Sequence, residues 1–288
     1  MSTTLLAVPN VSEGRNPAST DAIARAFATG VRLLDVHLDH DHHRSVFTLA
    51  GAPRALAPAV LAGAEAAVGH VDLPAHDGIH PRVGAIDVAP IVFLCDADRG
   101  AACAEALVLG DLLADQLKLP VFLYGILAQG RHRAEIRRGG PQALQGRIDA
   151  GEITPDFGPK RLHPTAGAVL VAARPPLVAF NVELAPPATL EDAKRIAALI
   201  RESGPDGLPG LRAIGLWLDQ TGVAQVSTNV EDHIAMPLAG VVEAVARYAT
   251  PVAAELVGLA PRRAFDGFPH DLPIRNKRIL EDTLPATD

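Results

Sequence analysis

A turn that runs into a strand, residues 75–88, concentrates side chains that can exchange protons or bind charge. It holds two histidines, two aspartates and one arginine around Gly78 and Pro81, which bend and stiffen the chain. His80 is best suited to acid–base chemistry, because an imidazole has an unperturbed pKa of about 6.5 and exchanges protons near neutral pH. A strand anchored in a core would hold such a side chain rigidly. A histidine that only caps a turn is the alternative interpretation.

A second polar cluster, residues 39–43, reads Asp-His-Asp-His-His and is followed by Arg44. Zinc binds histidine and carboxylate ligands, so a metal-dependent hydrolase that uses this cluster together with His37 is one hypothesis. Adjacent residues of a hairpin point in different directions, however, and a solvated polar turn is the alternative. Arg44 and Arg82 could each bind a carboxylate through two hydrogen bonds, or could lie on the surface without a ligand.

A connector rich in glycine and proline, residues 156–167, carries Lys160, Arg161 and His163 in a chain of formal net charge −7. It could receive a flat anionic ligand, or it could be a plain connector. The sequence contains no phosphate-binding loop, dinucleotide-binding fingerprint or nucleophile elbow.

Composition narrows the class of protein. The 288 residues are 48% hydrophobic and 20% charged, which is typical of a globular chain. No basic block is present, which argues against a nucleic-acid partner. Two cysteines, Cys95 and Cys103, make no disulfide framework in a chain of this length. The N-terminus does not resemble a signal peptide and no apolar run is long enough for a membrane span, so we expect a cytoplasmic protein.

Hydrophobic periodicity in the first half predicts the order strand, helix, strand, strand, helix, strand. The expected strands are 5–11, 31–36, 44–50 and 83–88 with its continuation 91–94. The first helix should begin at Asn16 or Ser19 and end at Gly30, and the second should span 54–68. This order is the split βαβ pattern of ferredoxin-like domains.

The second half repeats the same order of elements with little residue identity, so we infer a structural repeat rather than a sequence repeat. Its expected strands are 177–184, 211–218, 223–230 and 252–257, and its expected helices are 190–201 and 238–249. Between the halves lies an insertion with a helix at 101–117, strands at 121–124 and 168–173, and a helical turn at 134–138. We therefore predict an α+β protein of two ferredoxin-like (βαββαβ) subdomains, 1–174 and 175–288, the first with an inserted extension. The tail from residue 261 is expected to be polar and loop-like.

This topology predicts which residues meet. In a split βαβ unit the first two strands run one way and the other two run back. The end of the first strand, the hairpin between the second and third, and the start of the fourth therefore share one edge. We expect Asn10, the 39–43 tip, His76 and His80 to converge there.

At these motifs the chain resembles the formiminotransferase family, the transferase part of formiminotransferase-cyclodeaminase. The similarity runs in order through residues 5–260, and no helical cyclodeaminase domain is expected after it. The matching segments are Val8-Pro9-Asn10, Ser12-Glu13-Gly14, Leu33-Leu34-Asp35-Val36, Arg44-Ser45-Val46, His80-Pro81-Arg82, Ala85-Ile86-Asp87-Val88, Pro155-Asp156-Phe157-Gly158-Pro159, Ala179-Phe180-Asn181, Ala224-Gln225-Val226-Ser227-Thr228-Asn229 and Leu256-Val257-Gly258-Leu259.

The resemblance implies transfer of the formimino group of N-formimino-L-glutamate to N5 of tetrahydrofolate, in histidine degradation, by a homodimer that needs no metal. It places the catalytic histidine at His80. It places the folate contacts at Gly158, Pro159, Lys160, Arg161, Leu162, His163, Pro164, Thr165, Ala166 and Gly167. We assign the substrate contacts to Asn10, Asp35, His37, His43, Arg44 and Arg82.

The chain departs from the vertebrate pattern at His37, where an acid is usual, at His43, where asparagine is usual, and at residues 160–163. A related donor, formylglutamate or formiminoglycine, therefore stays open. A metal-dependent hydrolase and a folate-binding protein without catalysis are the hypotheses from other classes.

Overall fold

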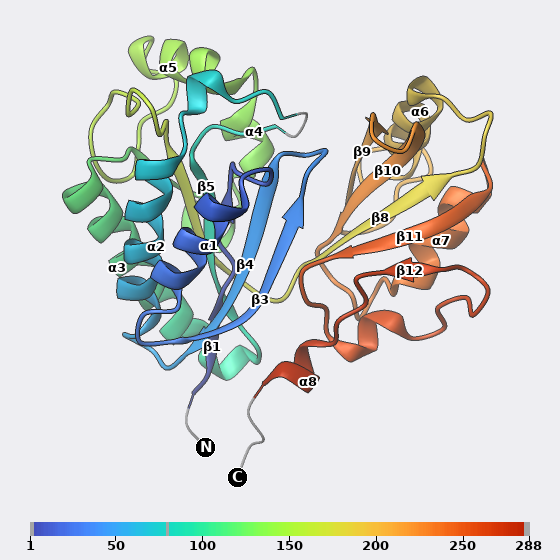
Figure 1. Ribbon diagram of the computed structural model, residues 1–288, viewed down its shortest axis with the longest axis horizontal. Coiled ribbons are helices and arrows are strands. Elements are labelled where there is room, and N and C mark those ends of the chain that lie inside the picture. Colours follow the sequence, from blue (N-terminus) through green and yellow to red (C-terminus); the bar gives the residue numbers. More distant parts are fainter. Residues whose placement is uncertain (1–2, 79–80, 285–288) are drawn as a thin grey trace. The chain divides into compact units, whose positions relative to one another are not determined.

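The computed structural model describes residues 3–78 and 81–284, and the chain divides after Pro175 into two units, each with its own sheet (Figure 1). In chain order the first unit contains β1 Leu5–Ala7, β2 Asn10–Val11, α1 Pro17–Phe27, β3 Arg32–Asp39, β4 Arg44–Gly51, α2 Leu56–His70, β5 Ile86–Phe93, α3 Arg99–Leu117, β6 Val121–Leu123, α4 Arg133–Arg137, α5 Gly140–Asp149 and β7 Val169–Arg174.

The sheet of the first unit has the ferredoxin-like strand order. β3 pairs with β4, β4 pairs with β1 and β2, and these pair with β5, all antiparallel. The inserted extension lengthens this sheet, because β7 pairs parallel to β5 and β6 pairs parallel to β7. The predicted fold class, with an extension in the first subdomain, is confirmed.

Proline and loop contacts set the strand ends in the first unit. The expected strand 5–11 is split into β1 and β2, since Pro9 has no N–H to donate to the ladder. Its carbonyl still accepts a hydrogen bond from the Phe47 N–H at 3.0 Å. The strand expected from residue 83 begins only at Ile86, because the Ala85 N–H is bonded to the Ala166 carbonyl of the connector.

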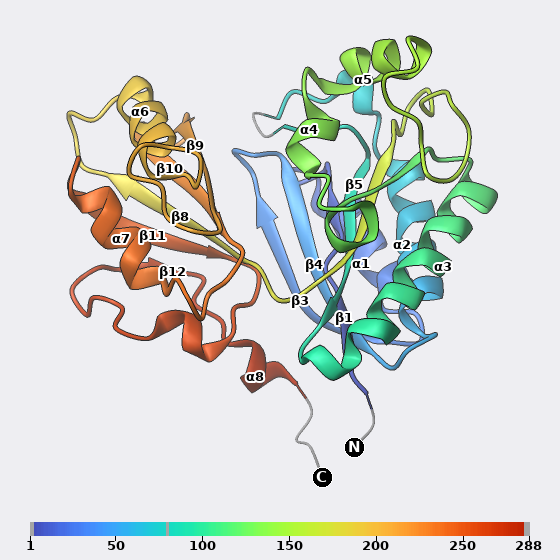
Figure 2. The same cartoon turned by 180° about the vertical axis from the view of Figure 1, so that it is seen from behind.

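Helices cover both faces of this sheet. Figure 1 shows α1, α2 and α3 side by side along one face, where their apolar side chains and those of β1, β4 and β5 form the main core. Gly63 lets α1 and α2 approach, since a Cβ there would lie 2.0 Å from the Phe27 ring. In Figure 2, α4 overlies β5, and Ile136, Leu144 and Ile148 of α4 and α5 form a second core on that face.

The second unit repeats the pattern with one sheet and helices on one face. It contains β8 Val178–Leu184, α6 Leu190–Ile200, β9 Leu211–Leu218, β10 Val223–Val230, α7 Leu238–Ala246, β11 Pro251–Val257, β12 Ile274–Arg275 and α8 Leu280–Thr283. Its strand order is β12-β11-β8-β10-β9. Thr189 and Asp192 form a capping box that begins α6.

The tail is more ordered than its polar sequence predicts. β12 pairs parallel to β11, and the Arg275 guanidinium donates to the Glu183 carboxylate on β8 at 3.1 Å. The expectation of a loop-like tail was therefore wrong, because partners far along the chain supply its hydrogen bonds. Within residues 3–78 and 81–284, no helix has the length and apolar character needed to cross a membrane.

Candidate functional site

The edge predicted from the topology forms in the first unit. Asn10 pairs with Val46 on one side and Val88 on the other, and Asp39 pairs with Arg44 at the hairpin tip. These registers bring several predicted site residues around one crevice of about 10 Å³. It is lined by Asn10, Val11, Ser12, His42, His43, Arg44, Arg82 and Asp87. His80, the predicted catalytic residue, lies outside the described residues.

Two histidines join the hairpin tip to the turn at residues 76–78. The rings of His43 and His76 stack with centroids 4.2 Å apart. His76 Nε2 lies 2.8 Å from the His43 carbonyl, and His76 Nδ1 accepts from the Gly78 N–H at 3.1 Å. His76 therefore donates through Nε2, and both nitrogens of its neutral ring are used. Burial lowers the pKa of His76 to about 4, so the ring is uncharged at neutral pH and serves as a structural link.

His43 occupies a left-handed backbone conformation, with φ of 49°, at the end of the tip. Its Nδ1 accepts a hydrogen bond from the Gly14 N–H at 3.2 Å, which leaves the proton of the neutral ring on Nε2. Burial lowers the pKa of His43 below its usual value. The Nε2 atom of His43 lies 3.9 Å from a carboxylate oxygen of Asp77, so its N–H faces that acid.

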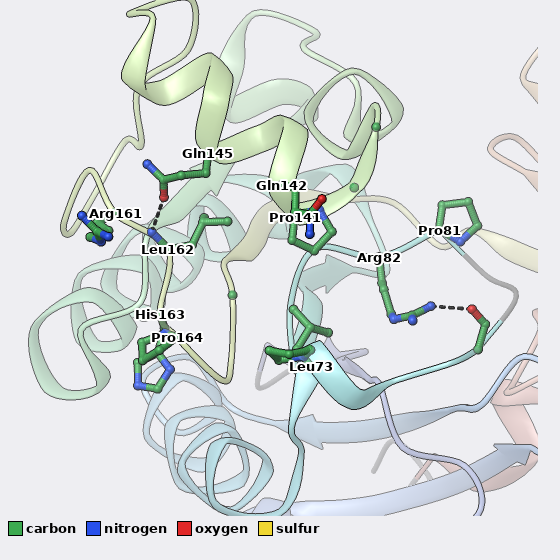
Figure 3. Close-up of a pocket in the computed structure, with 15 residues that line it drawn as sticks. Leu73, Pro81, Arg82, Pro141, Gln142, Gln145, Arg161, Leu162, His163 and Pro164 are labelled. Carbon is green, nitrogen blue, oxygen red and sulfur yellow. Dashed lines mark hydrogen bonds between the residues drawn. The ribbon is translucent and has the colours of Figure 1, made fainter.

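Arg82 holds the turn that precedes it. Its guanidinium donates to the carbonyl of Gly78 at 2.5 Å (Figure 3). It also donates to the carbonyl of His76. Gly78 is required here, because a Cβ would lie 2.6 Å from the His42 carbonyl oxygen. Arg82, predicted to contact the substrate, thus uses two hydrogen bonds to shape the wall between the crevice and a larger cavity.

Arg44 is the cation best placed to receive an anionic group in the crevice. Its Nε atom is buried and has no hydrogen-bond partner among the described residues. Burial lowers the pKa of Arg44 from its usual value, while the Asp39 carboxylate opposes that effect. An arginine keeps its charge under such shifts, so the group is a desolvated cation at the crevice wall.

A buried ion pair next to the crevice was not predicted from the sequence. Arg137 of α4 contacts the Asp87 carboxylate of β5, and the two side chains are 10% and 7% exposed. Asp87 also accepts from the Val83 N–H at 2.8 Å. The sequence did contain a signal for this ion pair, namely an aspartate within the apolar run 83–88. A carboxylate buried in such a run needs a hydrogen-bonding or charged partner. The pair fixes the start of β5, on which the crevice depends.

Asp35 and His37 lie on β3 away from the crevice lining. Their partners on β4 are Thr48 and Val46. Both side chains are buried, and burial lowers the pKa of His37 to about 4. The structure therefore does not bring these two predicted substrate contacts to the crevice.

The three histidines of the hairpin tip do not converge on one site. His42 is buried against Asp39, His43 faces His76, and His40 is exposed. In the part of the chain that the structure describes, no group of three or more His, Cys, Asp or Glu side chains is arranged to hold a metal ion.

A larger cavity of about 940 Å³ shares Arg82 with the crevice. Figure 3 shows the residues that line this cavity. Five of the ten predicted folate-loop residues line it: Arg161, Leu162, His163, Pro164 and Gly167. The others do not: Gly158, Pro159, Lys160, Thr165 and Ala166.

The opposite wall of the cavity comes from the extension. It is built by the N-terminal part of α5 and by the glycine that precedes this helix. Its residues at the cavity are Gly139, Gly140, Pro141, Gln142 and Gln145. Helix α5 was not predicted from the sequence. Leu73 and Pro74 add apolar surface from a short turn after α2.

Comparison with known proteins identifies relatives over most of the chain. The model of the formiminotransferase domain, N-terminal subdomain, matches residues 4–174, and that of the formiminotransferase domain matches residues 179–268. A glutamate formimidoyltransferase of Streptococcus pyogenes is 35% identical over 292 residues, covering 96% of this chain and 97% of that protein. One of Thermoplasma acidophilum is 35% identical over 269 residues, covering 89% of this chain and 88% of that protein.

The formimidoyltransferase-cyclodeaminase of Sus scrofa is 39% identical over 281 residues, which is 92% of this chain and 51% of that protein. The chain thus spans about half the length of such relatives.

Proposed function

Since the chain belongs to the formiminotransferase family that its motifs resemble, we propose that it is a glutamate formimidoyltransferase. The reaction moves the formimino group of N-formimino-L-glutamate to N5 of tetrahydrofolate. The observation that carries this proposal is the 35% identity to the Streptococcus pyogenes protein of that name over nearly the full length of both chains. Cyclodeaminase activity, named in relatives about twice as long, is not part of the proposal.

The crevice supports binding of an anionic donor. Arg44 offers a buried guanidinium whose Nε has no hydrogen-bond partner among the described residues, and a donor carboxylate would satisfy it. Asn10, on the same wall, can donate and accept through its amide. The crevice itself admits no more than a water-sized group, so the bulk of a donor would extend beyond it.

The cavity supports binding of tetrahydrofolate. Its volume of about 940 Å³ lies in the range of pockets for ligands of that size. Leu73, Leu162 and Pro164 offer apolar surface to a flat ring, while Arg161 and Arg82 offer positive charge to carboxylates of a glutamate tail. The apolar and basic side chains on the walls of the cavity therefore fit a molecule that is flat at one end and anionic at the other.

The proposed chemistry needs one proton acceptor that also returns the proton. A bond forms between N5 and the formimino carbon, and the bond from that carbon to the glutamate nitrogen breaks. His80 accepts the proton that the attacking amine loses and returns it to the departing nitrogen, a role worth roughly 10²–10⁴-fold in rate. Binding the two substrates side by side contributes much of the remaining acceleration.

A coupled assay with tetrahydrofolate and each of three donors, formiminoglutamate, formylglutamate and formiminoglycine, tests the proposal. We expect turnover with formiminoglutamate, and activity that survives exhaustive chelation. Turnover with another donor alone would reassign the substrate. Loss of activity with a chelator and rescue by zinc would favour a metal-dependent enzyme instead.

His80→Ala tests the proposed general acid–base. We expect loss of turnover with retained binding of tetrahydrofolate, because the variant removes the proposed proton acceptor. Near-native turnover would exclude His80 as the base. The cytoplasmic location and the homodimer stay predictions, and sedimentation analysis would measure the second.

A further inference from the structure

The side chain of Gln145 on α5 makes three hydrogen bonds at the edge of the cavity. Its Nε2 donates to the Asp149 carboxylate at 2.7 Å and to the Lys160 carbonyl at 3.3 Å. Its Oε1 accepts from the Leu162 N–H at 2.8 Å, as Figure 3 shows. The carboxamide thus joins the helix to the backbone of the connector on both sides of Arg161.

Asp149 fixes the orientation of this carboxamide. An ionised carboxylate only accepts hydrogen bonds, so the NH₂ group of Gln145 must face it. The oxygen must then face the Leu162 N–H, which needs an acceptor. The Lys160 carbonyl, which needs a donor, requires the same orientation, so the three partners of the carboxamide agree on one arrangement.

The segment 160–162 depends on Gln145 for its backbone hydrogen bonds. Within residues 3–78 and 81–284, the bonds to the Lys160 carbonyl and the Leu162 N–H both come from this side chain. The next segment, residues 163–167, is stabilised by its own backbone, because His163 and Gly167 exchange two hydrogen bonds of 2.9 Å. The Leu162 side chain packs against the core that contains Leu144 and Ile148 of α5.

We propose that Gln145, oriented by Asp149, is a positioning residue that sets where Arg161 stands on the cavity wall and thereby determines affinity for the folate co-substrate. The inference rests on the proposed function, because it takes the cavity as the folate site. Arg161 is exposed and has a long flexible side chain, so its backbone must be fixed if its charge is to meet a carboxylate at low entropic cost.

The test replaces Gln145 with methionine, which keeps length and helix propensity but removes all three hydrogen bonds. We expect the apparent KM and the Kd for tetrahydrofolate to rise about three- to tenfold, the factor that corresponds to the net worth of one hydrogen bond. The KM for the donor and kcat should stay within about twofold of wild type. Asp149→Ala should shift folate affinity in the same direction by a smaller factor.

The matched control is Gln116→Met, the same replacement at an exposed position of α3. It should leave both KM values unchanged. Hydrogen exchange at the Leu162 amide gives a readout independent of turnover, and the protection of this amide should fall in Gln145→Met and stay unchanged in Gln116→Met.

Three outcomes would overturn the inference in distinguishable ways. If wild type binds tetrahydrofolate in calorimetry and Gln145→Met binds it equally well, the positioning role is wrong and the proposed function stands. If Gln145→Met raises both KM values alike and lowers the Tm by many degrees, the residue is structural only. If wild type itself neither binds nor uses tetrahydrofolate, the proposed function fails and the inference fails with it.

Discussion

Replacement of Asp87 by asparagine should destabilise the first unit strongly. Asparagine keeps an oxygen for the Val83 N–H, which Asp87 accepts at 2.8 Å. It removes the charge that faces Arg137, whose side chain is 10% exposed. The Arg137 Nε already lacks a hydrogen-bond partner within the described residues. The variant therefore leaves a buried cation that has lost the carboxylate paired with it.

The expected magnitude follows from that geometry. Breaking a buried ion pair from one side costs about 3–5 kcal/mol, because the remaining charge is desolvated. For a unit of this size each kcal/mol lowers the Tm by about 2–4 °C, so we expect a fall of about 6–20 °C. The double variant Asp87→Asn/Arg137→Met removes the stranded charge and should recover much of the loss.

Urea unfolding followed by circular dichroism measures the free energy of unfolding of wild type, both single variants and the double variant. Asp115→Asn is the control in the same unit, because its ion pair with Lys118 at 3.6 Å is 76% and 72% exposed. It should change the free energy of unfolding by no more than about 0.5 kcal/mol. A loss below about 1 kcal/mol in Asp87→Asn, or additive losses in the double variant, would refute the reasoning.

Three further predictions concern ligand charge, acid stability and helix packing. A Lys160→Gln/Arg161→Gln variant should raise the KM for tetrahydrofolate more than that for the donor, and the difference should shrink with salt; equal folate affinities at low salt would contradict it. Because the pKa of His37 is lowered from 6.5 in the unfolded chain to about 4 in the folded one, its contribution to stability is complete above pH 6.5 and declines by about 3 kcal/mol as the pH falls to 4. In urea titrations the decline of His37→Gln should be smaller than that of wild type by this amount, and His76 accounts for part of what remains. Gly63→Ala should lower the Tm through an overpacking cost of about 1–3 kcal/mol, since its methyl group would lie 2.0 Å from the Phe27 ring; an unchanged Tm would show that α1 shifts freely.

Some features of the site were predictable because strand direction follows from element order alone. Once the βαββαβ order is recognised, the ends that share an edge are fixed, and Asn10 and the hairpin tip with His42 and His43 had to meet there. The family was predictable for a different reason, since its motifs are short runs that need no tertiary information. Asp35 and His37 show the limit: neither the motif that contains Asp35 nor the departure from the family pattern at His37 placed these side chains at the crevice.

The amino-acid sequence by itself determined the elements with a strong local pattern, such as β9 and β10, whose observed bounds equal the predicted ones. The buried residues of helix α5 are Leu144 and Ile148, so the hydrophobic periodicity of this segment is weak. Its helical structure depends on the packing of these two side chains in the second core.

Only the tertiary structure decided the contacts between distant positions. Asp87 and Arg137 are separated by 50 residues, and nothing local to either side chain specifies the other. The same holds for Gln145 and the connector it supports, and for β12, whose two residues pair with β11. Local propensity acts over a few residues, whereas burial of a polar group is set by whichever chain segment covers it, and that is a property of the folded whole.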